Sequence, residues 1–367
     1  PVRAPDERTT RFLQPVSALR KEPREARPPS TGHELDEFDL LPDEDAPLPR
    51  MPPLQPWNRL WPYLRRVLGE RQVGGAVDVP RLVGDVARLR PVLRVPRRHW
   101  QAWASSAVVV LDRNHSLAPF WPDMDDVVAR LLGARGSLGF ACRWVDQPPS
   151  LGEGLANLPL VGGGKREPIP PSAPVLVLSD LGRFARNADR TAQWIRFGRE
   201  LERRGHRLAA LLPCPRDRWI SAQTEVWPCG CWDRGEVLPR MEPGHCALPA
   251  PSATVSEGFE TLLNLLSPAV RIEPGLLRLV RLVLPPERAD VGTEFDVWHH
   301  PQMARTPLAI GFRPDAAAPR RLSRTFAELD ETSRLAAARW IVAWHRVFSP
   351  MLLAEAISHL GETTTRV

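Results

Sequence analysis

Small oxygen-bearing side chains follow a strongly apolar run near the middle of the sequence. Asp112 ends that run, and Asn114 and Ser116 follow it at spacings of two and four. A second acid, Asp180, ends a later apolar run. Because functional groups in an open parallel sheet gather beyond the carboxyl ends of the strands, we expect the two acids to share one edge. Carboxylates with small oxygen donors suit a hard cation, so the pattern predicts a Mg²⁺ site at Asp112, Asn114, Ser116 and Asp180.

Cysteine and histidine gather further along the chain, at Cys229, Cys231, His245 and Cys246. Thiolates and imidazoles are zinc ligands, but the spacing here is poor. Cys-x-Cys replaces the usual two-residue gap, and His245 and Cys246 are adjacent. We therefore predict separate thiols rather than a zinc site.

Three further motifs give little support for a reactive or ligand-binding site. The run Gly162-Gly163-Gly164-Lys165 lacks the Ser or Thr and the following helix of a phosphate loop. Cys214 lies between two prolines, without the helix N-terminus that activates a thiolate. His299 and His300 precede Pro301 at an expected helix end, where a cation favours the helix dipole.

The chemistry-bearing residues need a sheet to position them, and residues 104–253 predict one. Continuous apolar runs typical of buried parallel strands alternate with amphipathic helical patterns, which favours right-handed crossovers. Pro122 and the acids behind it suit the first turn of one such helix. After Pro215 the strand pattern stops. The expected strands are 105–111, 138–145, 174–179 and 207–212.

The flanking regions differ from this pattern. Residues 1–55 are rich in proline with charges in blocks, which predicts a disordered tail. Residues 56–103 predict a helical cap, and residues 254–367 an all-helical C-terminal unit. The fold class is therefore α/β, with a disordered tail and a helical unit around a parallel sheet.

The tail also contains an acidic block, from Glu34 to Asp45, in which Leu35, Phe38, Leu40 and Leu41 are interleaved. Such a pattern is typical of a segment that docks on a basic groove. The alternative is a solvated linker.

The arrangement of residues 104–215 resembles the von Willebrand factor A-like fold. That family carries Asp-x-Ser-x-Ser after its first strand and a later Asp at another strand end. Here the motifs read Asp112-x-Asn114-x-Ser116 and Ser179-Asp180-Leu181-Gly182, and the family's loop threonine has no counterpart between 133 and 171. The resemblance implies a cation that bridges to a partner carboxylate. Without a cation, Arg113 and Arg183 are expected to pair with partner acids, with Trp121 as an anchor.

A wider resemblance spans about residues 104–300. It is to bacterial von Willebrand A-like regions of multidomain conflict (defence) or NTP-dependent regulatory proteins. It implies a protein partner such as an AAA+ ATPase or an effector subunit, where a formylglycine-generating-enzyme-like domain or a protease can follow. The chain begins at Pro1, so we expect sequence beyond these 367 residues.

Composition narrows the classes. The net charge is +6, but Lys21 and Lys165 are the only lysines among 49 basic residues, so the excess reflects arginine usage more than a nucleic-acid binder. No apolar run is long enough to cross a membrane. With no secretory leader pattern and five cysteines, the chain is predicted to be cytoplasmic.

Three functions are weighed on these grounds. The first is a non-catalytic regulatory or adaptor module that mediates protein–protein interaction. The second is a metal-dependent hydrolase or nuclease that uses Asp112, Asp180 and either Asp123 or Asp125. The third is a nucleic-acid-binding module that uses Arg94–Arg98, where basic and aromatic residues are interleaved.

Overall fold

The computed structural model describes residues 49–150, 154–161, 169–184, 188–238, 255–306, 308–313 and 325–364. The predicted disorder of residues 1–55 falls mostly outside these ranges. The predicted end of the disordered tail, at residue 55, is too late in the sequence, because Leu54 and Gln55 are buried. The backbone N–H of Leu54 donates to Asp123 at 2.9 Å, which holds this stretch against the helix that carries Asp123.

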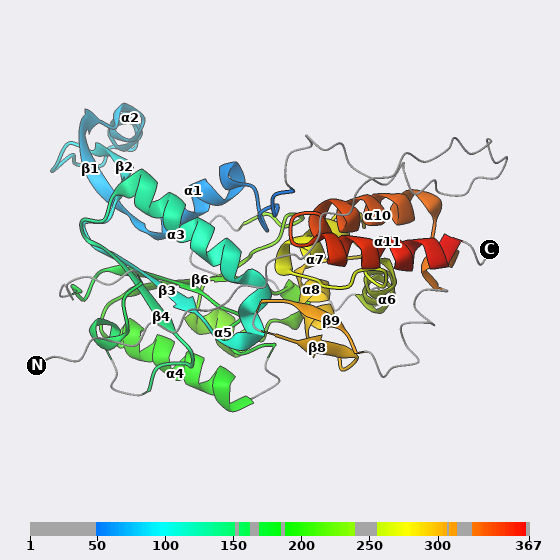
Figure 1. The fold of residues 1–367 in the computed structure, drawn as a ribbon. Coiled ribbons are helices and arrows are strands. Elements are labelled where there is room, and N and C mark those ends of the chain that lie inside the picture. The colour runs from blue at the N-terminus through cyan, green and yellow to red at the C-terminus, as the bar shows by residue number, and fades with distance from the viewer. Residues whose placement is uncertain are drawn as a thin grey trace, which may run out of the picture. The chain divides into compact units, whose positions relative to one another are not determined.

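A parallel sheet of five strands forms the centre, in the order β4-β3-β5-β6-β7 (Figure 1). Every residue of β3 and β5 is buried, as the continuous apolar runs predicted. The chain order reverses between β3 and β5, which pair in parallel from Val108–Val175 to Leu111–Leu178. The strands are β3 (Ala107–Asp112), β4 (Phe140–Val145), β5 (Pro174–Leu178), β6 (Arg207–Leu212) and β7 (Cys229–Cys231).

The end of the sheet differs from the sequence-based expectation. The prediction that the strand pattern stops after Pro215 is wrong, because β7 adds a fifth parallel strand beside β6. Its three residues are too short for a periodicity signal, and burial beside β6 is what makes them a strand. At the other edge, an isolated antiparallel bridge joins Arg143 of β4 to Leu160.

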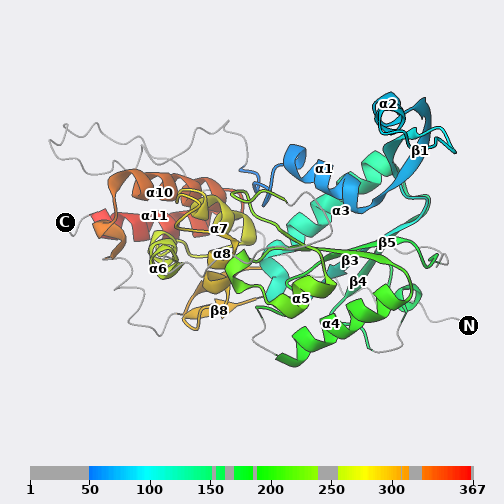
Figure 2. The same cartoon turned by 180° about the vertical axis from the view of Figure 1, so that it is seen from behind.

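Helices cover both faces of the sheet. Figures 1 and 2 show α1 and α3 over one face and α4 and α5 over the other. On the first face, the Tyr63 hydroxyl of α1 donates to the Ala210 carbonyl of β6 at 3.2 Å. The crossover helices are α3 (Trp121–Arg135), α4 (Ala188–Arg203) and α5 (Ser221–Val226). The 3₁₀ helix η1 (His115–Phe120) directly precedes α3. Short 3₁₀ turns also occur at η2 (Leu155–Asn157) and η3 (Arg216–Arg218).

The expected helical cap over residues 56–103 is only half helical. After α1 (Trp57–Val67), the chain forms the antiparallel hairpin of β1 (Gly69–Val77) and β2 (Arg97–Trp103), with α2 (Val79–Ala87) between the strands. The helical prediction was wrong at the strands, because most of their residues are exposed and few apolar side chains mark a buried face. Trp100 and Trp103 lie on β2.

The C-terminal part is mainly helical and has its own core. It consists of α6 (Val255–Leu265), α7 (Pro274–Arg281), α8 (Val291–Trp298), α10 (Glu331–His345) and α11 (Pro350–Thr364). A hairpin of β8 (Met303–Arg305) and β9 (Ile310–Phe312) interrupts the helices, so the all-helical prediction is wrong there. Among the described residues, no helix has the length and hydropathy that a bilayer span requires.

Candidate functional site: the sheet crest

Five polar side chains meet at the carboxyl edge of the sheet, where the strand order reverses. We call Asp112, Asn114, Ser116, Ser179 and Asp180 the crest. Asp112 ends β3, and Ser179 and Asp180 follow the neighbouring strand β5. The expectation that the two acids share one edge is confirmed. Reversal points of this kind are where open α/β sheets bind their ligands.

Asp112 is completely buried and accepts hydrogen bonds at both carboxylate oxygens. Its Oδ2 accepts from the Ser179 hydroxyl at 2.7 Å. Its Oδ1 accepts from the Asn114 backbone N–H at 3.0 Å and lies 3.4 Å from the Arg190 guanidinium of α4. A cation from the protein itself therefore already stands at this carboxylate.

Asp180 is also buried, and its partners are backbone N–H groups of the turn it begins. Its Oδ1 accepts from Gly182 at 3.0 Å and its Oδ2 from Phe184 at 2.6 Å. Leu181 and Gly182 have φ of 52° and 80°, a left-handed pair that is strained for the leucine. The Gln223 amide donates to the Leu181 carbonyl at 2.8 Å, and this bond helps to hold the strained turn.

Asn114 and Ser116 bond to each other and to the loop after β4. The Asn114 Oδ1 accepts from the Ser116 hydroxyl at 2.6 Å and from its backbone N–H at 2.9 Å. The Asn114 amide donates to the Asp146 carbonyl at 3.2 Å. After Asn114 the chain forms the 3₁₀ helix η1, and the His115 ring lies 5.8 Å from that of Trp121.

These contacts are a poor fit to Mg²⁺. The ion prefers free carboxylate oxygens and several waters in an octahedral shell. Here all four oxygens of Asp112 and Asp180 accept hydrogen bonds within the protein, and Arg190 supplies a positive charge. The described residues contain no group of three or more His, Cys, Asp or Glu side chains placed to hold a metal ion.

Burial makes both acids weak. Burial and, after it, the nearby Asp180 raise the pKa of Asp112 to about 7, against the lowering effects of Arg190, Ser179 and Asn114. Burial likewise raises the pKa of Asp180, against the backbone N–H groups of Phe184 and Gly182. The two carboxyl groups of the crest therefore ionise less readily near neutral pH than exposed carboxyl groups do.

The C-terminal part of the chain covers the crest. Phe295 of α8 stacks on Phe184 of the Asp180 turn, with ring centroids 3.7 Å apart. Beside it, Arg218 pairs with Asp296 of α8. Since Asp112 and Asp180 are at most 1% exposed, nothing outside the molecule reaches their carboxylates in this arrangement.

The three predicted partner-binding residues are engaged within the chain. Arg113 pairs with Asp125 and lies over the Trp121 ring at 5.7 Å. The Arg183 guanidinium donates to the Arg218 carbonyl. Trp121 begins α3 and packs against both hydrophobic cores.

The cysteines are buried thiols in the described part of the chain. Cys229 and Cys231 lie on β7 and donate to backbone carbonyls, while His245 and Cys246 lie outside the described residues. Burial raises the pKa of Cys214 and of Cys231, the opposite of an activated thiolate. The Gly162–Lys165 loop also lies outside the described residues.

His299 corrects another expectation. It follows α8, and its ring stacks on Phe295 with centroids 3.9 Å apart. Burial lowers the pKa of His299, so it is not the cation that the helix dipole would favour. Trp227, between α5 and β7, is fully buried and donates to the Trp194 carbonyl at 3.1 Å.

Sequence reasoning missed a buried ionic cluster that joins the sheet to the C-terminal helices. Arg278 of α7 pairs with Asp123 of α3 and with Glu294 of α8. Arg281 pairs with Glu294 and with Asp233, which follows β7. Arg278 and Arg281 lie three residues apart in an otherwise apolar helical pattern, and that is the signal that could have revealed buried arginines. Asp123, weighed as a catalytic acid, is a structural member of this cluster.

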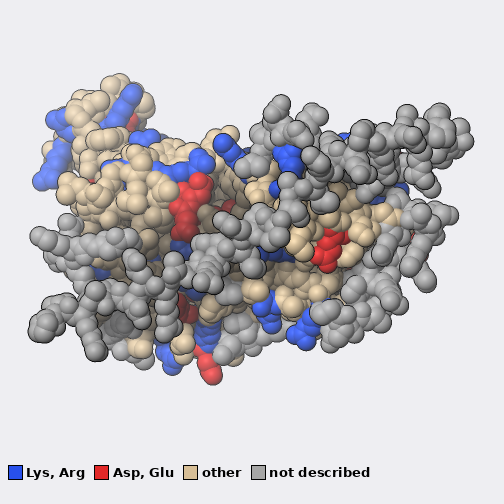
Figure 3. Space-filling model, in the orientation of Figure 1, with Lys and Arg blue, Asp and Glu red and all other residues tan. Residues whose placement is uncertain are grey.

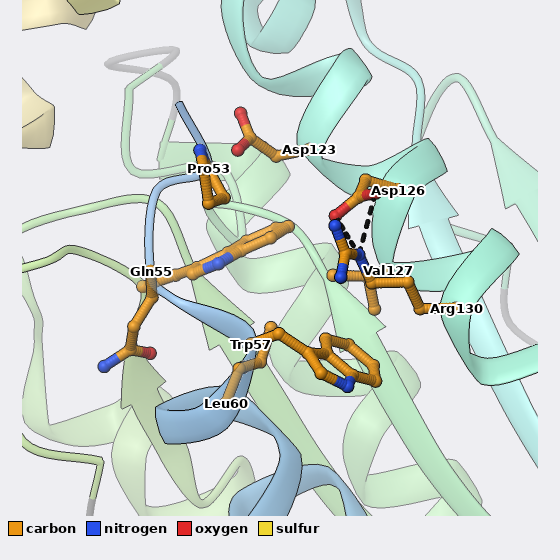
Figure 4. A pocket seen from close by; sticks show the side chains of 9 residues that line it. Pro53, Gln55, Trp57, Leu60, Asp123, Asp126, Val127 and Arg130 are labelled. Carbon is orange, nitrogen blue, oxygen red and sulfur yellow. Dashed lines mark hydrogen bonds and ion pairs between the residues drawn. The ribbon is translucent and has the colours of Figure 1, made fainter. Parts of the chain in front are cut away.

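One small pocket lies away from the crest. Figure 4 shows Asp123, Asp126 and Arg130 of α3 facing the segment that contains Pro53, Gln55 and Trp57. Arg130 pairs with Asp126 at 2.7 Å and lies over the Trp57 ring at 5.5 Å. The Gln55 amide donates to the Glu236 carbonyl at 2.9 Å, and none of the residues that line the pocket belongs to the crest.

Comparison with known proteins adds no relative: no protein-family model, no curated protein and no solved structure matches this chain.

Proposed function

We propose that this chain is a non-catalytic regulatory or adaptor module, built on a von Willebrand A-like sheet, that works through protein–protein contacts. The observation that carries this proposal is the state of the crest. Both carboxylates are buried and use their oxygens in hydrogen bonds within the protein, and α8 packs on the turn that Asp180 begins. The crest therefore serves as a packing surface for the C-terminal helices.

Catalysis at the crest would need a nucleophile activated by a base, or an acid–base pair within reach of a substrate. The Ser179 hydroxyl donates to Asp112, but it also accepts from the Leu181 N–H and is completely buried. A substrate has no path to it while α8 is in place. Partners of the expected kind, an AAA+ ATPase or an effector subunit in a bacterial regulatory or defence system, would then bind elsewhere on the chain.

A metal-dependent hydrolase is the second candidate. The observation in its favour is the pair of buried acids, because a carboxyl group with a pKa of about 7 is suited to general acid–base chemistry. It would require α8 to move away and Arg190 to yield its place to a cation.

One experiment separates the two. The full chain is titrated with Mg²⁺ and with Mn²⁺ by calorimetry, and is assayed with each ion against a phosphodiester and a peptide substrate. The adaptor proposal expects no heat of binding at the crest and no turnover. Turnover that Asp112→Asn abolishes, in a variant that stays folded by circular dichroism, would overturn the adaptor proposal in favour of the hydrolase.

A further inference from the structure

An arm of the molecule exposes most of its apolar side chains. We call residues 69–103, which form β1, α2 and β2, the arm. Of the eighteen exposed large hydrophobic side chains among the described residues, ten lie here. Leu89 and Leu93 are 93% and 90% exposed, and α2 buries no residue. The ten are Val73, Val77, Val79, Val83, Val86, Leu89, Val92, Leu93, Val95 and Trp100.

Such a surface is unusual for a protein without a partner. A two-stranded hairpin is marginally stable by itself, and contiguous apolar patches mark interaction sites. The body of the protein supports only the base of the arm, where Ala102 is buried and the Arg65 guanidinium donates to the Gln101 carbonyl at 3.1 Å. The outer part has no cover among the described residues.

The arm is also basic. It has seven arginines against Glu70, Asp78 and Asp85. None of those arginines forms an ion pair with an acid in the part of the chain that the structure describes. Figure 3 shows blue atoms beside tan atoms on the arm, at the upper left. A ligand that complements this surface in charge and hydrophobicity is therefore both acidic and apolar. The arginines are Arg71, Arg81, Arg88, Arg90, Arg94, Arg97 and Arg98.

We propose that the arm is the docking site for residues 35–45 of the same chain. That segment contains six acids and no basic residue, with Leu35, Phe38, Leu40 and Leu41 between them. Its acids match the arginines of the arm in charge, and its apolar side chains match the exposed valines and leucines. The match is to an extended or helical peptide laid on an apolar surface with a basic rim.

The chain connectivity allows this contact. Leu54 is fixed against Asp123, and α1 follows it and leads directly to the arm. The 11 residues of α1 rise by about 16 Å. The residues between 45 and 54, when extended, span roughly 30 Å. The acidic segment therefore reaches the base of the arm, and its own length carries it along the outer part.

Other ligands fit less well. Single-stranded nucleic acid binds by stacking bases on aromatic rings, but Trp100 and His99 are the only aromatic rings on the outer part of the arm. An anionic membrane would engage a basic face with Trp, Phe and Leu beneath it, whereas seven of the ten exposed apolar residues are valine. The proposal concerns a surface separate from the crest, so it stands or falls independently of the function proposed above.

The test is a charge swap followed by hydrogen exchange on the full chain. The segment variant is Asp36→Arg, Glu37→Arg and Asp39→Arg; the arm variant is Arg90→Glu, Arg94→Glu and Arg98→Glu. Each alone is expected to speed amide exchange in residues 35–45 and 79–95 by about tenfold or more, since docking protects both. The two together are expected to restore protection. A matched control, Arg196→Glu, Arg199→Glu and Arg339→Glu, removes three exposed arginines elsewhere and is expected to change neither region.

Apolar contact is tested separately by Leu89→Ser with Leu93→Ser, which is expected to remove the protection without unfolding the chain. Equal exchange in the wild type and all variants would overturn the proposal. Protection that rises with protein concentration would assign the site to a second copy, also against it. Binding of an RNA oligomer or of phosphatidylserine vesicles that the arm variant loses, with residues 35–45 unprotected, would replace the proposal with that ligand.

Discussion

Asp112 shows how one buried carboxyl group sets a pH dependence. Its pKa is about 7 in the folded chain and near its ordinary value of 3.8 when unfolded. The folded state therefore binds the proton more tightly. The stability from this group is complete below the unfolded pKa of 3.8 and is lost as the pH rises through 7. A serine hydroxyl and a backbone N–H offset only part of the cost of burying the charge.

The prediction is that Asp112→Asn removes this slope. Relative to the wild type, the variant is expected to gain stability on the order of 3 kcal/mol between pH 4 and pH 7.5, because each pKa unit is worth about 1.4 kcal/mol. The measurement is urea unfolding of both proteins across that range. A wild-type minus variant difference that does not change with pH would contradict the assignment.

Asp330 supplies a control of opposite sign. It caps α10, and a hydrogen bond from the Ser333 backbone N–H lowers the pKa of Asp330. Its contribution is present above the unfolded pKa and is lost as the pH falls. Asp330→Asn is therefore expected to change the slope below pH 4 and to leave the region around pH 7 as in the wild type.

At the scale of elements, α4 and the end of α5 make a close contact at Gly198. A Cβ at Gly198 would lie 2.5 Å from Val226 and 2.7 Å from the Trp227 ring, so only glycine fits there. Trp227 cannot move aside easily, because it is fully buried and bonded to Trp194.

We expect Gly198→Ala to destabilise the fold by about 1–3 kcal/mol through overpacking, despite the higher helix propensity of alanine. Gly133 of α3 is the matched control, since a Cβ there meets nothing within 4 Å. Gly133→Ala is expected to stabilise by up to about 1 kcal/mol. Thermal unfolding by circular dichroism measures both, and equal effects would show that the close approach is not what requires glycine.

For the whole molecule, the buried ionic cluster decides whether the sheet and the C-terminal helices act as one unit. Arg278 is fully buried between Asp123 and Glu294, and its guanidinium also donates to the Pro52 carbonyl at 3.2 Å. Val291 and Phe295 of α8 belong to the hydrophobic core of the sheet. Hydrophobic packing and ion pairs therefore both connect the sheet to the C-terminal helices.

The chain is expected to unfold in one cooperative transition. Arg278→Met is expected to lower its stability by about 3–5 kcal/mol, because the buried Asp123 loses its ion-pair partner and Glu294 keeps only Arg281. Arg203→Ala, at an exposed pair with Glu200, is the control and is expected to cost at most about 1 kcal/mol. Calorimetry of the full chain measures both the number of transitions and the change in stability. Two separate transitions in the wild type would contradict the coupling.

The sequence alone determined the central strands and the placement of the two crest acids. Runs such as that of β5 are apolar at every position, and only burial on both faces of a parallel sheet requires that. Since each acid ends such a run, their meeting at one edge followed from the direction of the strands once β3 and β5 were neighbours.

Only the tertiary structure decided what the crest can do. The cover by α8, the Arg190 guanidinium at Asp112 and the pairing of Asp123 with Arg278 all join residues more than 70 positions apart. The short strand β7 and the exposed arm also depended on neighbours, because three buried residues or an exposed hairpin leave no periodic pattern. Local propensity and periodicity report which face of an element is buried, whereas the partner of a buried charge is set by which elements pack together.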